Sequence, residues 1–270
     1  MSKQVHYKIH GDGRPILILH GGYLDHRHMV DAIEPVFEQI AGWRRVYIDL
    51  PGHGHSKVDA SIDNNDNVLD IILNFMDDIA PGEQYALIGE SRGGYLARGI
   101  VFKRSESVRG AMFIVPGRYA VPREGSVPVH KTLVRADDLV PTLAEHEVSR
   151  FDRLVVQNQE ILEKIRSTKI PATELADKGH LKGIDENYEF SFDVDSPAQP
   201  FLKPSLFLLG RQDTMVGYRD AWQAIENFPR ATFAILDKAG HSLSWEQPHL
   251  FVALAREWLN RIKEFDDNVS

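Results

Sequence analysis

Short, mainly apolar runs recur along the chain, and segments with the apolar spacing of helices lie between them. The runs cover residues 15–19, 46–50, 85–88, 108–115, 205–209 and 231–236. A short apolar run of this kind is typical of a strand that is buried on both faces of a mostly parallel sheet. Helices are expected over residues 65–79, 93–104, 218–226 and 247–262. The alternation predicts an α/β fold with a mostly parallel, doubly wound sheet and helices on both of its faces.

The first strand of the chain has a different pattern. Residues 5–9 alternate between apolar and polar side chains, and Gly11, Asp12 and Gly13 follow them. Alternation followed by turn residues is typical of a hairpin, so we expect the chain to enter the fold through a β-hairpin.

The strand pattern is interrupted between residues 117 and 203, where the chain is polar and has no buried run. A helix is expected near Thr142, because Thr142 and Glu145 have the spacing of a capping box. An apolar stripe follows, formed by Val148, Phe151, Val155, Leu162 and Ile165. We therefore divide the chain into a core, residues 1–116 and 204–270, and an inserted helical cap, residues 117–203.

Composition limits the partners of the protein. Its 270 residues carry a net charge of -8, with a pI near 5.8, which argues against nucleic acid or an acidic membrane surface as a partner. The absence of cysteine excludes disulfides, thiolate metal sites and a cysteine nucleophile. No apolar run approaches the roughly 20 residues of a membrane helix, and the N-terminus has no apolar signal core. We expect a soluble, cytoplasmic protein whose partner is a small-molecule substrate, and the pattern leaves its oligomeric state open.

One apolar run ends in the motif G-x-S-x-G, at residues 89–93, and a helix-forming segment follows it. In this strand–turn–helix context the turn holds Ser91 in strained backbone geometry and exposes its hydroxyl above the carboxyl end of the sheet. A serine hydroxyl is a weak nucleophile at neutral pH, so it needs a base, and the base needs an orienting acid.

An acid and a histidine follow later strands in the order that this chemistry requires. Asp213 comes directly after the run at 205–209, and His241 comes after the run at 231–236. Because the carboxyl ends of parallel strands meet at one edge of a sheet, both side chains can converge on Ser91. We expect Ser91 to attack, His241 to take and return the proton, and Asp213 to orient the imidazole and stabilise its charged form.

Attack by a serine on a carbonyl also needs hydrogen-bond donors for the developing oxyanion, each typically worth about 3 kcal/mol. The backbone N–H of Arg92, directly after the nucleophile, is one candidate. The second candidate is the N–H of Gly22 or of Tyr23, which follow the strand ending at His20.

Together, these motifs resemble the α/β-hydrolase fold superfamily, in the branch with a serine nucleophile and a helical cap. The residues that carry the resemblance are H-G-G at 20–22, D-L-P-G-H-G-H-S at 49–56, G-E-S-R-G-G at 89–94, G-R-Q-D at 210–213 and G-H at 240–241, followed by E-Q-P at 246–248. The resemblance covers the chain outside residues 117–203 and implies a substrate pocket between cap and core. Serine at position 91, in place of aspartate, disfavours the haloalkane dehalogenase and epoxide hydrolase branches.

Arg92 departs from the family pattern, which usually has a smaller or uncharged residue at this position. One hypothesis is that Arg92 or Arg118 faces the pocket and binds a substrate carboxylate or carbonyl, since guanidinium suits planar recognition. The alternative is that Arg92 pairs with a nearby acid, such as Glu90 or one on the cap. A group of acidic residues near the end of the cap is expected to be solvated surface, namely Asp185, Glu186, Glu189, Asp193 and Asp195.

Two H-x-H pairs, His26 with His28 and His53 with His55, raise the alternative of a metal site. Both pairs are expected in loops, and no carboxylate–histidine signature joins them, so no metal and no other cofactor is predicted. His20 is expected to have a packing role.

The sequence therefore predicts a serine hydrolase that cleaves a small organic substrate through an acyl-enzyme, most simply a carboxylic ester. One alternative on the same fold is a C–C bond hydrolase acting on a β-diketone or dienoate. Another is a receptor that uses the capped pocket to bind a small ligand without catalysis.

Overall fold

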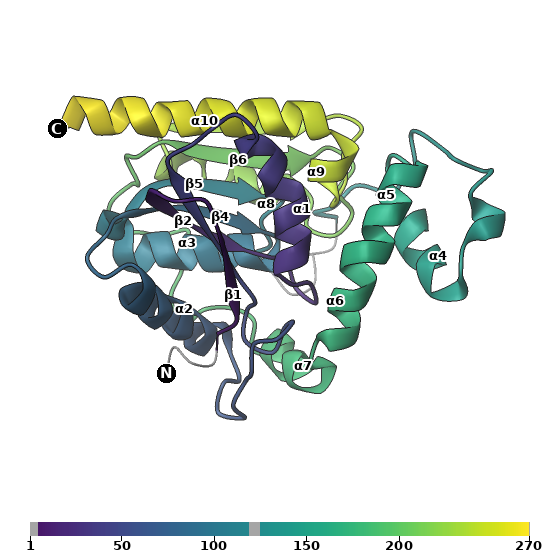
Figure 1. Ribbon diagram of the computed structural model, residues 1–270, viewed down its shortest axis with the longest axis horizontal. Coiled ribbons are helices and arrows are strands. Elements are labelled where there is room, and N and C mark those ends of the chain that lie inside the picture. The colour runs from purple at the N-terminus through teal and green to yellow at the C-terminus, as the bar shows by residue number, and fades with distance from the viewer. Residues whose placement is uncertain (1–4, 119–124, 270) are drawn as a thin grey trace.

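The computed structural model describes residues 5–118 and 125–269. Within these residues, seven strands form one sheet in the order β1-β3-β2-β4-β5-β6-β7 (Figure 1). Their bounds are β1 Tyr7–His10, β2 Arg14–Leu19, β3 Trp43–Ile48, β4 Tyr85–Glu90, β5 Val108–Ile114, β6 Ser205–Gly210 and β7 Ala231–Leu236. The pairing of β1 with β3 is antiparallel, and the other pairings are parallel. The predicted α/β fold with a mostly parallel sheet is confirmed.

The predicted N-terminal hairpin is wrong. Strand β1 pairs with β3, with Tyr7 opposite Ile48, and β2 lies on the other side of β3. The turn between β1 and β2 therefore has to pass the start of β3. A Cβ atom on Gly13 would lie 2.5 Å from the carbonyl oxygen of Gly42, so the two backbones approach closely there. Burial on both faces makes β2 an inner strand with two parallel neighbours, and the polar β1 takes the edge.

Helices cover both faces of the sheet. One face packs against α1 (His26–Phe37) and α10 (Pro248–Val269), and the other packs against α2 (Asn65–Ile79) and α3 (Arg92–Arg104) (Figure 1). Alternate residues of β2 divide between the two layers: Ile16 and Ile18 belong to the first apolar cluster, and Leu17 and Leu19 to the second. Because both clusters are buried, the strands read as continuous apolar runs in the sequence.

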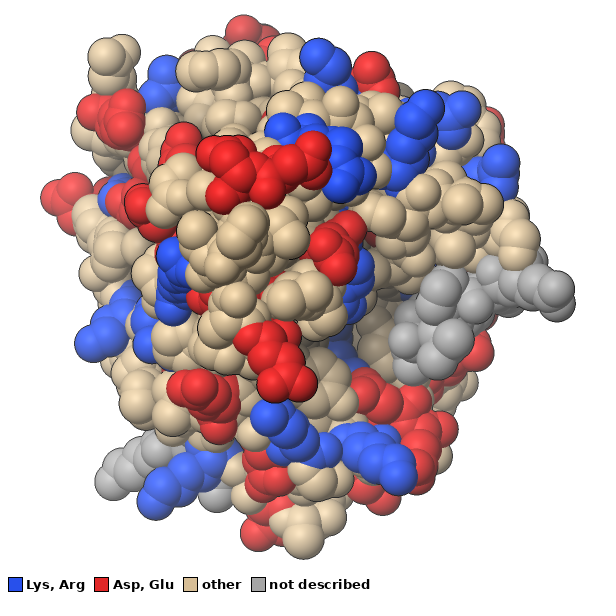
Figure 2. Space-filling model, turned by 90° about the vertical axis from the view of Figure 1, so that its right-hand side faces the viewer, with Lys and Arg blue, Asp and Glu red and all other residues tan. Residues whose placement is uncertain are grey.

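Residues 117–203, the inserted segment, join β5 to β6. Their described helices are α4 Glu145–Asp152, α5 Gln159–Lys164, α6 Ile170–Leu175 and α7 Lys178–Glu186, with one π-helical turn, Ile165–Lys169, between α5 and α6. These helices lie beyond the carboxyl ends of the strands, on the right in Figure 1. Figure 2 faces this side and shows acidic and basic side chains intermixed over it.

Two parts of the inserted segment pack in different ways. Phe151, Leu162 and Ile165 form a small apolar cluster of their own, which Trp245 of the short helix α9 (Leu243–Glu246) joins from the core. Apolar residues of the later part of the segment, from Ala176 onward, belong to the cluster that contains α2 and α3. The division into core and cap at residues 117 and 203 thus stays a prediction, with part of that segment packed as core.

The first helix of the inserted segment begins later than the sequence indicates. Thr142 donates its hydroxyl to the carbonyl of Leu139, and α4 starts at Glu145. The carboxylate of Glu147 accepts from the N–H of Ala144 at 2.9 Å, so this glutamate satisfies an N-terminal donor in place of the expected Thr142–Glu145 box. In the expected stripe, Val148 is 39% exposed, and the other members are buried.

The remaining described helix in the core is the short α8, Arg219–Trp222, which covers only the first part of the expected helix at 218–226. Among the described residues, no helix combines the length and hydrophobicity that crossing a membrane requires.

The two-layer core predicts unequal effects for the same substitution on an inner strand and on the edge strand. Ile18 is fully buried in β2, and Ile9 is 42% exposed on the edge strand β1. Ile18→Ala removes buried apolar volume, and we expect it to lower the free energy of unfolding by about 3 kcal/mol. The matched control Ile9→Ala is expected to cost about 0.5 kcal/mol. Guanidinium chloride unfolding followed by circular dichroism measures both, and equal losses would contradict the assignment of β1 to the edge.

Candidate active site

The turn between β4 and α3 holds Ser91 in a strained conformation. Its φ is 53° and its ψ is -116°, a combination that residues with a side chain rarely adopt. The turn closes because two glycines allow the backbone segments to touch. A Cβ atom on Gly89 would lie 2.3 Å from the carbonyl oxygen of Gly93, and one on Gly93 would lie 2.5 Å from that of Leu19. This turn therefore requires glycine, for steric reasons, at the first and last positions of the G-x-S-x-G motif.

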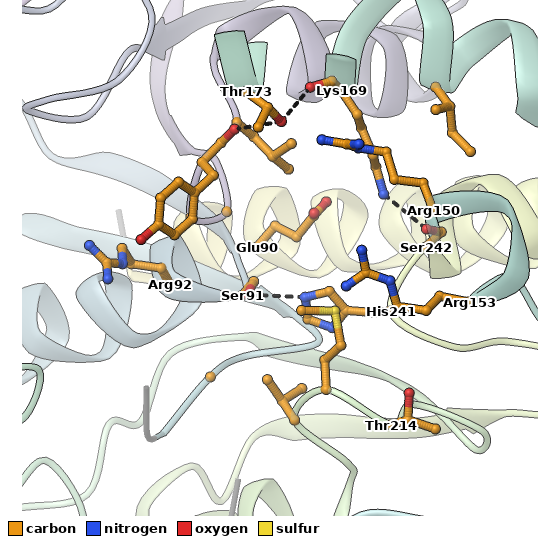
Figure 3. Close-up of a pocket in the computed structure, with 18 of the residues that line it drawn as sticks. Glu90, Ser91, Arg92, Arg150, Arg153, Lys169, Thr173, Thr214, His241 and Ser242 are labelled. Carbon is orange, nitrogen blue, oxygen red and sulfur yellow. Dashed lines mark hydrogen bonds between the residues drawn. The ribbon is translucent and has the colours of Figure 1, made fainter. Parts of the chain in front are cut away.

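The structure brings Ser91, His241 and Asp213 together. The Oγ of Ser91 lies 3.1 Å from Nε2 of His241 (Figure 3). On the other side of the ring, Nδ1 of His241 lies 2.9 Å from Oδ2 of Asp213. The other oxygen of Asp213 accepts from the N–H groups of Met215 and Val216 at 2.8 and 3.1 Å. These bonds fix the carboxylate, so that Nδ1–H of the imidazole donates to it and Nε2 faces the serine as an acceptor.

Charge around His241 favours its protonated form. Burial alone would lower the pKa of this imidazole, but the fully buried carboxylate of Asp213 and the bond to it raise the pKa above 6.5. The arrangement therefore stabilises the imidazolium that forms when the histidine takes a proton.

Backbone donors lie beside the serine hydroxyl. Gly22, Tyr23 and Arg92 line the same cavity as Ser91. Arg92 is the first residue of α3, so its N–H has no acceptor within the helix. In the described part of the chain, the N–H groups of these three residues donate to no protein acceptor. They are thus available to an oxyanion, although the three residues come from two separate loops.

His20 joins the loop of Gly22 and Tyr23 to the loop that begins at Asp49. Its Nδ1 lies 2.7 Å from the carbonyl oxygen of Gly21, and its Nε2 accepts from the N–H of Leu50 at 2.9 Å. Burial lowers the pKa of His20, which matches an imidazole that donates through one nitrogen and accepts through the other. This role is structural, and it positions the loop of Gly22 and Tyr23.

A buried carboxylate precedes the serine. Both oxygens of Glu90 lie within 3.0 Å of Nε2 of His28, and both residues are buried. Burial would raise the pKa of Glu90, but His28, together with the charges of Lys169 and His241, outweighs burial and lowers that pKa. Glu90 therefore carries a negative charge below the site and pairs with His28, not with Arg92.

Arg92 forms an ion pair with Asp185, from helix α7 of the inserted segment. Its guanidinium also lies 5.2 Å from the ring centre of Tyr188, and burial lowers its pKa. Asp185 in turn accepts from the hydroxyl of Tyr23 at 2.7 Å. The expectation that Asp185 belongs to a solvated acidic surface is therefore wrong, because this carboxylate connects the inserted segment to Arg92 and to Tyr23.

Arg118 lies apart from the cavity lining that the structure describes. Its Nε is 3.0 Å from Asp195, and its other nitrogens approach Glu189 and Asp193 at 3.3 and 3.6 Å. Asp195 also pairs with Arg98. The structure thus places Arg118 in an ion-pair network and does not bring it to Ser91.

The cavity above Ser91 has a volume of about 370 Å³ and lies between the strand ends and the inserted segment. Its lining includes three cationic residues that motif analysis missed, Arg150, Arg153 and Lys169 (Figure 3). They lie in the part of the chain without family motifs, and only the packing of that segment brings them over the site.

The paired histidines do not form the site that their spacing suggests. Instead His6 and His26 each place Nδ1 2.8 Å from a different oxygen of Asp49. These three residues offer ligand atoms within 4.8 Å of one another. Both oxygens of Asp49 also accept backbone N–H groups, from His26 and His55. Burial would raise the pKa of Asp49, but the bond from the His26 imidazole and these backbone bonds lower it. The carboxylate is thus already fully hydrogen-bonded, and the cluster is explained as the anchor of the 49–56 loop.

The electrostatic coupling of His241 to Asp213 can be measured without any substrate. We expect the imidazole to titrate above 6.5 in the wild-type protein, because the Asp213 carboxylate stabilises its protonated form. In Asp213→Asn the charge is removed while the shape is kept, so the midpoint should fall. Nitrogen-15 NMR titration of His241 measures the shift, with Asp137→Asn on the exposed surface as the control. An unchanged midpoint in Asp213→Asn would contradict the coupling.

Comparison with known proteins gives relatives over nearly the full chain. The chain is 24% identical to the pimeloyl-[acyl-carrier protein] methyl ester esterase of Shewanella woodyi, over 97% of this chain and 100% of that protein. An alpha/beta superfamily hydrolase from Oenococcus oeni has a similar structure, with a TM-score of 0.89 and 25% identity over 96% of this chain and 97% of the other. The esterase RhEst1 from Rhodococcus has a TM-score of 0.72 and 19% identity, over 95% and 94% of the two chains, and shows the same fold.

The family model of the alpha/beta hydrolase fold matches residues 14–248, which is most of the chain. That range includes the serine turn, the acid and the histidine, as well as the inserted segment. The resemblance stated from the motifs is thus confirmed at the level of the family. The chain belongs to the alpha/beta hydrolase fold family and is a hydrolase.

Proposed function

We propose that this protein is a serine esterase that forms an acyl-enzyme on Ser91. The observation that carries the proposal is the continuous line of hydrogen bonds from Asp213 through His241 to the Ser91 hydroxyl, at the base of a cavity. The Shewanella woodyi relative, which is named as a methyl ester esterase, supports this reaction class.

The geometry supports the following first half-reaction. As Ser91 Oγ attacks the carbonyl carbon of the ester, His241 Nε2 takes the hydroxyl proton, and the carbonyl oxygen becomes an oxyanion. The N–H of Arg92 and that of Gly22 or Tyr23 donate to this oxyanion. When the intermediate collapses, the C–O bond to the alcohol breaks, and His241 returns the proton to the leaving oxygen. The products are the free alcohol and the acyl group on Ser91.

Water completes the cycle by the same steps. His241 takes a proton from water, the hydroxide attacks the acyl carbon, and a second tetrahedral intermediate forms in the same oxyanion site. Its collapse breaks the bond to Ser91 Oγ, which regains its proton from His241, and the carboxylic acid leaves. Asp213 stays ionised throughout and stabilises the imidazolium in both halves.

The strained serine turn serves this chemistry directly. With φ at 53°, the Ser91 side chain stands at the tip of the turn, and the adjacent N–H of Arg92 begins helix α3. Nucleophile and oxyanion donor are thus neighbours in sequence, held by one rigid turn. The positive end of the helix dipole adds to the stabilisation of the oxyanion.

The direct test uses a fluorophosphonate probe and a short-chain p-nitrophenyl ester. We expect a probe adduct on Ser91 and a loss of ester turnover of roughly 10³-fold or more in Ser91→Ala, because the nucleophile is removed. Ser61→Ala, in an exposed loop, is the matched control and should retain full turnover. Mass spectrometry locates the adduct, and absorbance measures turnover.

Two results would contradict the proposal. Turnover that persists in Ser91→Ala would place the chemistry on another group. Absence of both adduct and turnover in the wild-type protein would favour a ligand receptor.

Accumulation of an acyl group on Ser91 during ester turnover would distinguish the esterase from a C–C hydrolase in which histidine and water carry out most of the reaction.

A further inference from the structure

Three cationic side chains gather on one side of the cavity. Arg150, near the end of α4, and Arg153, directly after that helix, point into the space above Ser91 and His241 (Figure 3). Lys169, from the π-helical turn, donates from Nζ to Ser242 Oγ at 2.9 Å. All three residues come from the inserted segment, so its position over the sheet assembles the group.

The two arginines differ from the other arginines near the site because their hydrogen-bond acceptors are backbone carbonyls and not carboxylates. Arg150 donates to the carbonyl of His146 and Arg153 to that of Ser149, both at 2.9 Å and both one helical turn earlier. Among the described residues, neither forms an ion pair. A guanidinium has five N–H donors, so most of the donors of each group remain available to a ligand.

Among the described residues, Lys169 forms no ion pair either. Its charge is attracted by Glu90 and Glu246, but Glu90 is paired with His28. Glu246 accepts from the N–H groups of Gly240 and Val155, at 2.5 and 2.7 Å. Both acids are thus bonded to other partners, and the lysine contacts a hydroxyl and the face of Trp245, 4.5 Å from the ring centre.

The resulting charge in the cavity is opposite to that of the protein. The described lining contains four cationic side chains, Arg92, Arg150, Arg153 and Lys169, against the two carboxylates of Glu90 and Asp185. The whole chain carries -8. On the outer face of the inserted segment both signs are intermixed (Figure 2), so the excess of positive charge is a property of the cavity.

The three cations also repel one another. Burial is the main cause of the lowered pKa of Lys169, and Arg153 and Arg150 lower it further. An anionic group between them would relieve this repulsion and gain charge-assisted hydrogen bonds. A planar carboxylate matches the paired donors of a guanidinium.

We propose that the cavity selects esters that also carry a free carboxylate, and that Arg150 and Arg153 bind this carboxylate with support from Lys169. This assignment rests on the proposed esterase function and names its substrate class. It replaces the expectation for Arg92 and Arg118, whose guanidinium groups are bonded to carboxylates of the inserted segment.

The experiment compares charged and neutral esters of matched size. One pair, monomethyl and dimethyl glutarate, has the carboxylate in the acyl part. The other pair, acetoxyacetate and 2-methoxyethyl acetate, has it in the alcohol part. The readout is the ratio of kcat/KM for the charged ester to that for the neutral one, measured by pH-stat, and the two pairs locate the carboxylate within the substrate.

We expect the wild-type ratio to exceed one in at least one pair. In Arg150→Gln and in Arg153→Gln it should fall by about tenfold, the size of one partly exposed charge-assisted bond. Arg153→Lys should keep part of the preference because it keeps the charge. Arg135→Gln is the control, since Arg135 is exposed on the same segment and pairs with Asp137. Salt should reduce the ratio in the wild type.

A ratio of one or less in both pairs, or a ratio that Arg150→Gln and Arg153→Gln leave unchanged, would overturn the inference while esterase turnover stood. Calorimetric binding of glutarate to Ser91→Ala tests the anion site without hydrolysis. If no ester were turned over, but glutarate bound about tenfold more weakly after Arg153→Gln was added, the anion site would stand and the esterase proposal would fail. Absence of glutarate binding to Ser91→Ala would count against the anion site.

Discussion

The close contact of two glycines at the end of β4 is the constraint on which the site depends. A Cβ atom on Gly89 would clash with Gly93 at the start of α3, and one on Gly93 would clash with Leu19 at the end of β2. Ser91, between the two glycines, has a positive φ. An isolated peptide would relax from this conformation, so the surrounding sheet has to hold it. The apolar clusters on both faces of the sheet supply this restraint, because they fix β4 between β2 and β5. The stability of the core and the placement of Ser91 therefore depend on the same packing.

The inserted segment does more than cover the cavity. Its Asp185 pairs with Arg92 and accepts from Tyr23, so it contacts both the start of α3 and the loop that follows β2. On the other side, the N–H of Val155 is held by Glu246, which also accepts from the N–H of Gly240, next to the histidine. The inserted segment is thus in direct contact with Arg92, with Tyr23 and with the loop of His241.

The arginines near the site differ in whether a carboxylate of the protein pairs with them. Arg92, Arg98 and Arg118 face acids of the inserted segment, and those pairs offset the desolvation of the buried guanidinium groups of Arg92 and Arg98 and of the half-buried one of Arg118. Arg150 and Arg153 reach the cavity from its more exposed side, where water can solvate them until a ligand arrives. This difference in burial explains why arginines of one small region can have different roles.

The sequence by itself determined the alternation of strands and helices, the turn at Ser91 and the order of serine, acid and histidine, because apolar runs and glycine spacing act locally. It did not determine that β1 pairs with β3, since edge pairing depends on which neighbours the inner strand β2 takes. It also did not place Arg150, Arg153 or Lys169 over the serine. Those positions depend on how a segment without family motifs docks on Trp245 and Glu246, and only the tertiary structure decided that contact.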